Sequence, residues 1–346
     1  GGIGAAVAFN NFKQNNISKG IKQDYNFTNF FLCANVQLKL KGNKNFRLNY
    51  SGMAVAPSLQ QLQPIVDNSN PLSIFVGNGD LKQSFTNNFF GNFNWSKPLG
   101  DNSIWSYFSY STINNAFTQF NSIDSLGRNV YKTVNVNGNK SFNADFDYNF
   151  PIGSGKKKIQ MSVGPTVQFN RNIDFINGFK NINNTYSYGI NIQFYKYVED
   201  KFDFNAGPRF NYNHSTSSIN LASNTDYWSI GGWGQGSVYL KKGLSINSNV
   251  NFNFRQKDPR LTSNNNFTRW NADIKKYVYK KELSLKFSVN DILNQNRGYE
   301  NNFSTYKFTE SYFNVLKRYW LLTFTWEFTH NKKQAAAPAA TVEPIK

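Results

Sequence analysis

The chain has little of what disulfide-bonded proteins, metalloproteins and helical membrane proteins depend on. Its 346 residues include one cysteine, Cys33, and two histidines that lie far apart, His214 and His330. A single cysteine excludes an intramolecular disulfide, and so few His and Cys side chains predict no metal site. No run of 18 apolar residues occurs, which excludes a membrane-spanning α-helix.

Catalytic patterns are equally sparse. His214 has Ser215 beside it, but neighbouring residues of a strand point to opposite faces and cannot act together on one substrate. No glycine-rich loop leads from a strand into a helix, the arrangement that holds the phosphates of a nucleotide. We therefore expect no enzymatic activity and no cofactor.

What the sequence has instead is a repeated alternation of polar and apolar residues. Aromatic residues make up 17% of the chain, and they recur at every second position of several stretches. The clearest alternation runs through residues 141–150, 159–170, 202–212, 246–254 and 320–328. A period of two is that of a strand with one apolar and one polar face, and about ten such residues can cross a membrane as a tilted strand.

The sequence therefore predicts an all-β fold, a transmembrane antiparallel β-barrel, over residues 1–329. Residues 330–346 are of low complexity and are expected to form a disordered tail. Runs bounded by turn residues predict fourteen strands, near 2–10, 26–40, 45–54, 84–97, 103–120, 130–150, 157–173, 182–197, 201–214, 225–240, 243–256, 264–279, 282–292 and 315–329.

Connections between these strands are expected to alternate in length. Short turns separate the second strand from the third, the fourth from the fifth, and so on along the chain. Strict alternation of this kind is typical of a transmembrane barrel, with short turns on the periplasmic side and longer loops outside. The longer loops are predicted at 11–25, 55–83, 121–129, 174–181, 215–224, 257–263 and 293–314.

The formal charge of +18 makes the position of the cations important. Fourteen lysines lie at or beside the predicted short turns: Lys39, Lys41, Lys44, Lys97, Lys156, Lys157, Lys158, Lys201, Lys241, Lys242, Lys275, Lys276, Lys280 and Lys281. Cations spread around a rim do not form the continuous groove that a nucleic acid requires, so no nucleic-acid partner is expected. They either keep the turns hydrated or attract anionic headgroups of outer-membrane lipids.

The two phases of the clear strands predict two environments. Residues of the apolar phase are expected to face lipid, and residues of the polar phase are expected to face a wet lumen. The predicted lipid-facing residues are Phe146, Phe204, Phe252, Trp320, Leu322, Phe324, Trp326 and Phe328. The predicted lumen-facing residues, which are candidates for ligand contact, are Asp145, Asp147, Arg209, Asn247, Asn249, Asn251 and Glu327. The stretches 104–119 and 224–240 do not allow their faces to be assigned.

Segment 50–83 is the most distinctive part of the chain. It contains Pro-Ser-Leu at 57–59 and Gly-Asn-Gly-Asp-Leu-Lys at 77–82, and it resembles the signature loop of the outer-membrane β-barrel family within the TonB-dependent receptors. Gly79 stands where that family usually has proline, and Gln83-Ser84 stands where Pro-Glu is common. The signature residues in this chain are Pro57, Leu62, Pro64, Asn68, Pro71, Gly77, Asn78 and Asp80. Residues 288–294 and 317–325 are similar to the family's last two strands.

This resemblance covers residues 1–329 and implies a larger receptor. Its members have a barrel of about 22 strands closed by an N-terminal plug, and they import ligands with energy relayed by TonB. The chain would then supply about fourteen C-terminal strands, with the plug, its TonB box, the signal peptide and the remaining strands expected to be absent. A surface lipoprotein is a further candidate partner. Siderophores, glycans, peptides and cobalamin all remain open as ligands.

Two other classes of protein fit the same strands. One is a barrel that is not energised and has a structural, secretion or adhesion role, which the upstream sequence would distinguish. The other is a soluble all-β binding protein, which would leave the membrane without detergent. The long loop at 55–83 is expected to pack on the barrel mouth or a plug, or to contact a ligand directly.

Overall fold

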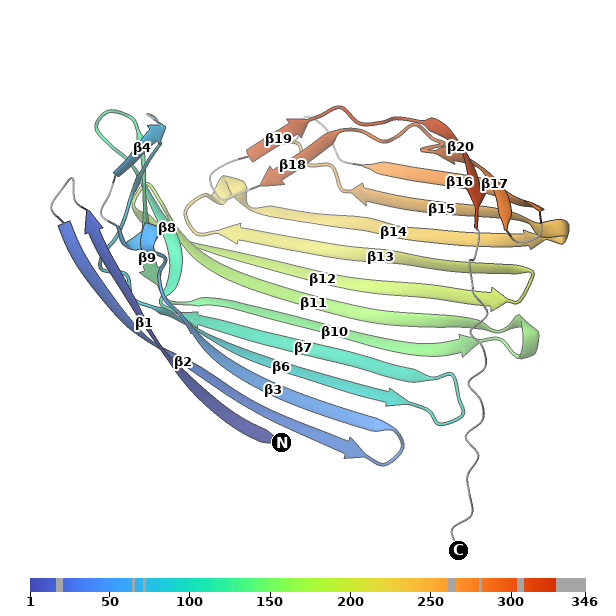
Figure 1. The fold of residues 1–346 in the computed structure, drawn as a ribbon, viewed down its shortest axis with the longest axis horizontal. Helices are drawn as coiled ribbons and strands as arrows, with labels where there is room; N and C mark the ends of the chain where they lie inside the picture. Colours follow the sequence, from blue (N-terminus) through green and yellow to red (C-terminus); the bar gives the residue numbers. More distant parts are fainter. Residues whose placement is uncertain are drawn as a thin grey trace, which may run out of the picture.

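The computed structural model describes residues 1–16, 21–63, 66–70, 73–260, 266–279, 282–303 and 308–327. Their main feature is one fourteen-stranded sheet in which every neighbouring pair is antiparallel (Figure 1). Each predicted strand corresponds to one of its members, so the all-β antiparallel prediction is confirmed. The strands, in their order across the sheet, are β1 (Gly2–Asn16), β2 (Ile21–Leu40), β3 (Lys44–Val55), β6 (Ser84–Ser96), β7 (Ser103–Asn114), β10 (Asn139–Ile152), β11 (Ile159–Ile176), β12 (Phe179–Val198), β13 (Phe202–Ser217), β14 (Thr225–Leu240), β15 (Leu244–Arg255), β16 (Phe267–Tyr279), β17 (Leu283–Asn290) and β20 (Tyr319–Trp326).

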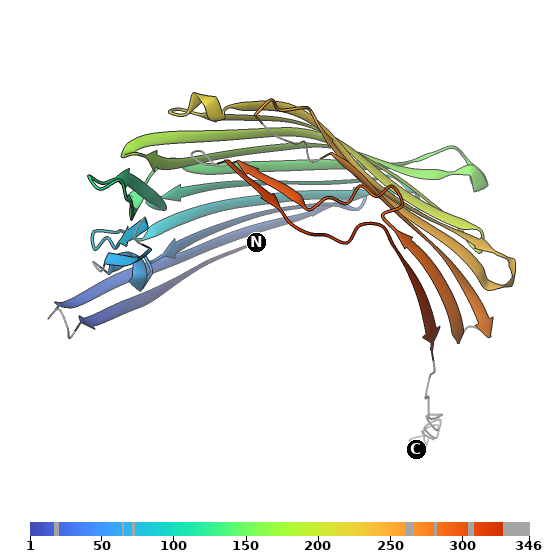
Figure 2. The ribbon, with the colours of Figure 1, turned by 90° about the horizontal axis from the view of Figure 1, so that it is seen from above.

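The sheet is bowed but open. Seen from above in Figure 2, it curves from β1 at one edge to β20 at the other. Among the described strands, β1 pairs only with β2 and β20 only with β17. The curvature is that of a barrel wall, while a closed barrel of about 22 strands stays a prediction.

The two ends of the sheet differ, as predicted, because short turns gather at one end and longer connections at the other (Figure 1). Two of the predicted long loops are wrong. Strand β1 continues to Asn16 and β2 begins at Ile21, and the whole connection between β11 and β12 is Asn177-Gly178. These two residues have φ angles of 50° and 83°, as a two-residue hairpin turn requires, and Asn-Gly is the pair that adopts it at least cost.

Two predicted strands are each divided in the structure. The run 103–120 breaks at Asn115 (φ 51°), and the run 130–150 breaks at Gly138 (φ 113°), because a positive φ turns the chain out of the sheet. The separated pieces, β8 (Ala116–Ile123) and β9 (Asn129–Val136), leave the wall and pair with each other. Alternation alone cannot reveal such a change of sheet, since both sides of each break have the same period.

Strands β8 and β9 join part of the loop at 55–83 in a second sheet, which we call the rim sheet. Its strand order is β4 (Val66–Asn70), β5 (Ser73–Val76), β9 and β8, and β5 runs parallel to β9. It packs on the wall through Ala116 and Val136, which are buried against Ile173 of β11. The predicted loop at 55–83 therefore contains regular structure.

Smaller elements complete the fold. The loop at 55–83 also contains the one-turn helix α1 (Leu59–Leu62). Within the predicted loop at 293–314, β18 (Tyr299–Phe303) and β19 (Phe308–Tyr312) form a hairpin. No helix of the described residues is long and apolar enough to cross a membrane.

The wall has one polar and one apolar face, defined by strand register. Directly paired residues share a face, so an uninterrupted apolar row crosses seven strands: Val198, Phe202, Val238, Ile246, Ile274, Phe287 and Leu322. One residue away, a polar row crosses five: Asp203, Ser237, Asn247, Asp273 and Ser288. We call these the apolar face and the polar face.

Candidate functional site

Three of the predicted lumen-facing residues lie in one cavity on the polar face. The cavity has a volume of about 740 Å³, and Asp145, Asp147 and Arg209 are the charged residues that line it. It extends from β10 to β14, and most of its remaining lining is amide or hydroxyl side chains, among them Asn191 and Asn211. The cavity therefore offers many hydrogen-bonding groups and few charges. We call it the polar basin.

Three glycines lie beneath side chains that line this basin. A Cβ atom at Gly164 of β11 would lie 2.4 Å from Oδ1 of Asp147, and one at Gly189 of β12 would lie 2.5 Å from Oγ1 of Thr166. At Gly207 of β13 a Cβ atom would lie 2.9 Å from Nε1 of Trp233. The side chains of Asp147, Thr166 and Trp233, which line the basin, thus lie directly over glycine positions of three adjacent strands. Glycine inside a strand commonly marks such a close approach.

The carboxylates at the edge of the basin are held by neighbours of different kinds. Asp145 is paired with Tyr107 of β7 and forms a side-chain hydrogen bond with it. Asp147 is paired with Trp105 and accepts a hydrogen bond of 3.1 Å from the hydroxyl of Ser162. Each carboxylate can accept further hydrogen bonds, because two oxygens provide about four acceptor positions.

Aromatic rings lie beside these carboxylates, on the face that the sequence could not assign. The rings of Trp105 and Tyr107 are 5.3 Å apart, and Phe90 of β6 stacks on Tyr107 at 6.1 Å. Register places all three on the polar face, because Trp105 and Tyr107 pair with Asp147 and Asp145. The polar face therefore includes a group of exposed or half-exposed rings at its β6–β7 side.

The remaining polar candidates lie away from the basin. Asn247 donates to Oδ2 of Asp273 at 2.7 Å, and Asn249 accepts from Asn271 at 2.8 Å, so both are members of cross-strand polar pairs. Asn251 pairs in register with Trp233 and Arg269. Glu327 follows β20 and lies outside the polar basin.

A second cavity, of about 1000 Å³, lies at the short-turn end. Four lysines line it. Lys201 lies in the turn before β13, Lys241 and Lys242 lie in the turn before β15, and Lys275 lies in β16. Predicted Asn247 also borders it. Lys280 and Lys281, which were predicted beside a short turn, lie outside the described residues.

The predicted lipid-facing residues lie on the apolar face. Trp320, Leu322, Phe324 and Trp326 of β20 are between 62% and 71% exposed, and Phe146 is 40% exposed. Exposure of large apolar side chains in a continuous surface is unfavourable in water and is expected where lipid covers them. Phe204 and Phe252 are half-buried on this face, and Phe328 lies outside the described residues.

The signature segment forms contacts with the rim and not with the basin. Pro57 and Leu62 are fully buried, and Ser58 caps α1 by accepting the amide of Gln61. Gly77 has no room for a side chain, since a Cβ atom there would lie 1.5 Å from the carbonyl oxygen of Gln63.

The Gly-Asn-Gly-Asp element of this segment ties the rim sheet together. Asn78 donates to the carbonyl of Thr133 at 2.8 Å, and its Oδ1 accepts the amide of Asp80 at 3.2 Å. Of the other signature residues, Pro64 and Pro71 lie outside the described residues. Asn68 is placed by its backbone within β4.

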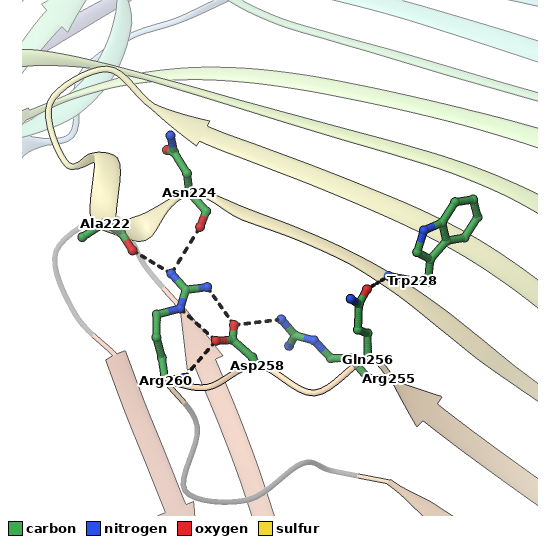
Figure 3. Close-up of polar contacts among 7 residues, drawn as sticks. All are labelled: Ala222, Asn224, Trp228, Arg255, Gln256, Asp258 and Arg260. Carbon is green, nitrogen blue, oxygen red and sulfur yellow. Dashed lines mark hydrogen bonds and ion pairs between the residues drawn. The ribbon is translucent and has the colours of Figure 1, made fainter.

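A polar cluster joins two of the longer connections at the same end as the rim sheet (Figure 3). Arg260, between β15 and β16, donates to the carbonyl of Ala222 at 2.7 Å and of Asn224 at 3.3 Å. Its guanidinium also bonds both oxygens of Asp258, at 2.9 and 2.7 Å. Arg255 lies 3.8 Å from the same carboxylate. We call this group the loop clamp.

The loop clamp has an electrostatic consequence. The hydrogen bonds from the Arg260 side chain hold the pKa of Asp258 below its usual value, and the Asp258 side chain is only 10% exposed. The same interaction raises the pKa of Arg260. Both groups are therefore charged at neutral pH, and together they fix the connection between β13 and β14 relative to the one between β15 and β16.

Sequence reasoning missed the three glycines beneath the lining of the basin and the indole of Trp233. Gly164, Gly189 and Gly207 occupy the polar phase of their strands, where a side chain is expected, and that position was a usable signal. Trp233 was missed because alternation in β14 is obscured by glycines on both phases. The bonds of the loop clamp from Arg260 to the carbonyls of Ala222 and Asn224 have no local sequence signal, because they join residues 38 and 36 positions apart.

The described residues contain no group of three His, Cys, Asp or Glu side chains that could hold a metal ion. No curated protein matches this chain. The profile of the outer membrane protein beta-barrel family matches it in two stretches, residues 7–174 and 155–326, which together reach every strand of the wall and leave out only the first residues of β1. The chain belongs to the outer membrane protein beta-barrel family, whose members lie in the outer membrane.

Proposed function

We propose that this chain is the wall of a TonB-dependent receptor that imports a ligand across the outer membrane. The observation that carries the proposal is the polar basin, a cavity rich in hydrogen-bonding groups on the face opposite the apolar surface. A wall with a purely structural role needs a hydrated inner face, but it does not need polar side chains of five adjacent strands around one cavity of this size.

The folded rim supports the same proposal. Loops with a buried hydrogen bond such as that between Asn78 and Thr133 hold a fixed shape, which a receptor needs in order to select a ligand. The loop clamp holds two further connections in place. The resemblance of residues 50–83 to the signature loop of TonB-dependent receptors points in the same direction.

The proposal implies partners beyond this chain. In lipid, the edges of β1 and β20, which have no second partner among the described strands, must be satisfied by further strands, because the bilayer core offers no water to their amides and carbonyls. We propose that such strands complete a barrel of about 22, that a plug fills its lumen, and that TonB engages the plug. Outer-membrane lipids would cover the apolar face, and a surface lipoprotein would contact the rim.

Binding to TonB tests this function directly. The protein as its gene encodes it, purified in detergent, should bind the purified periplasmic domain of TonB from the same organism, as measured by biolayer interferometry. An outer-membrane porin of similar size serves as the matched control. Absence of binding, with both proteins folded, would favour the barrel that is not energised and has a structural, secretion or adhesion role.

A further inference from the structure

We infer that the polar basin is a binding site for a neutral carbohydrate, which is recognised through its hydroxyl groups and one apolar sugar face. The inference rests on the proposed function and names the class of its ligand. Cations, anions and apolar compounds fit this cavity less well, because of the polar side chains that line it and the indole of Trp233 beside them.

The charge of the lining excludes strongly charged ligands first. In a chain of net charge +18, the basin holds two carboxylates and one guanidinium, those of Asp145, Asp147 and Arg209. Nine further lining residues carry uncharged amides or hydroxyls. Anions would meet the two carboxylates, and a simple cation would leave the amides without a partner. A ligand with many neutral donors and acceptors satisfies all of these groups.

The ring of Trp233 constrains the shape of that ligand. The side chains of Asp147, Thr166 and Trp233, which line the cavity, lie close over Gly164, Gly189 and Gly207, so the glycines let these side chains lie near the sheet. An indole presents an apolar face together with a polar N–H. The axial C–H groups of a sugar ring match such a face, while the equatorial hydroxyls reach Asp147, Asn191 and Arg209.

Size supports an oligosaccharide over a single sugar. A volume of about 740 Å³ is within the range of sites that enclose drug-sized ligands. Tyr227 lines this basin and also a neighbouring cavity of about 400 Å³ that extends toward the rim. Trp105 and Tyr107 lie on the opposite side of the two carboxylates. A chain of several sugar units can occupy the basin and continue toward either neighbour.

Calorimetric titration of the protein as its gene encodes it, in detergent, tests the inference. Three neutral hexasaccharides serve as probes: maltohexaose, cellohexaose and mannohexaose. We expect at least one to bind. Trp233→Leu should weaken that binding by at least about tenfold, as the loss of a central aromatic contact does. Asp147→Asn should also weaken it, because a carboxylate accepts stronger hydrogen bonds than an amide.

Matched variants away from the basin serve as controls. Asp273→Asn replaces a carboxylate that pairs with Asn247, and Trp270→Leu replaces an indole that bonds Ser248 on the other face. Both should leave affinity within about twofold. Binding that weakens equally in the controls, no binding of any hexasaccharide, or binding of hexaglycine in their place would each overturn the inference. Failure here together with TonB binding would leave the import function standing, since the two measurements are separate.

Discussion

The side-chain amide of Asn78 donates to the backbone carbonyl of Thr133, 55 residues later, and both residues are buried. This bond joins the signature segment to the connection between β7 and β10. Asn135 strengthens the junction, since it donates to the carbonyl of Lys82 at 2.9 Å and accepts the amide of Lys82 at 2.8 Å. Two loops therefore behave as one folded unit above the wall.

Replacing Asn78 should loosen that unit. Asn78→Ala leaves the carbonyl of Thr133 buried without its donor, which costs about 1–3 kcal/mol. We expect faster amide hydrogen exchange in β5 and β9, with little change in β12 and β13, as measured by mass spectrometry. Asn68→Ala lies in the same segment and is the control for a general effect of substitution. Unchanged exchange in β9 would show that the bond does not couple the loops.

The loop clamp predicts a dependence of stability on pH. Because its folded pKa is lowered, Asp258 stabilises the folded state above its ordinary pKa of about 3.9, and that contribution is lost as pH falls through the lowered folded value. Asp258→Asn should therefore destabilise the protein at pH 7, by about 1 kcal/mol after allowance for the partly exposed Arg260. The difference in stability between the variant and the original chain should shrink as the pH is lowered below about 3.9.

Urea titration in micelles at pH 7 and pH 2 measures this difference. Asp273→Asn provides the control carboxylate on the wall. A difference between Asp258→Asn and the original chain that persists unchanged at pH 2 would show that the ionised carboxylate is not the source of the stability.

The faces of the wall predict opposite effects of a new charge. Phe252→Arg places a cation on the apolar face and should cost about 2–4 kcal/mol if that residue lies near the bilayer midplane. Asn249→Arg places it on the polar face, between the uncharged Gln235 and Asn271, and should be nearly neutral. Folding titrations into lipid vesicles compare the two. Equal costs would refute the assignment of lipid to the apolar face.

The turn between β11 and β12 depends on its two residues. Asn177 has a φ angle of 50°, a conformation that costs most residues about 1–2 kcal/mol but costs asparagine less. Asn177→Ala should lower stability by about 1 kcal/mol, and Asn177→Gly should not. Thermal unfolding in micelles distinguishes the two variants. A destabilised glycine variant would contradict this explanation, because glycine keeps the backbone amide that Asn177 donates to the side chain of Asn121.

Much of the wall could be predicted because its physics is local. The alternation in residues 141–150 and 159–170 reflects two solvents on two faces, and each strand reports it independently of its partners. The same locality explains the errors. Asn115 and Gly138 change the sheet to which β8 and β9 belong, and a single φ angle leaves no trace in the alternation.

The site was predicted only in part. Asp145, Asp147 and Arg209 were among the predicted lumen-facing residues, but the sequence did not separate them from Asn247 and Asn249, which lie elsewhere. What separates them is register, since a cavity depends on which residues of adjacent strands lie side by side. Register between β10, β11, β12 and β13 is a long-range property, and the alternation within each strand does not show which residues of neighbouring strands are paired.

The parallel pairing of β5 with β9 has a consequence for the order of assembly. Its partners come from two different hairpin connections, so they cannot meet until β3, β6, β7 and β10 already stand in register. Joining β5 to β9 before other contacts form would close a long loop of chain. The entropy cost of that closure is removed only when the intervening wall strands are already paired. The rim sheet must therefore form after the wall. A chain stopped midway through insertion would have paired wall strands while its rim sheet is still unfolded.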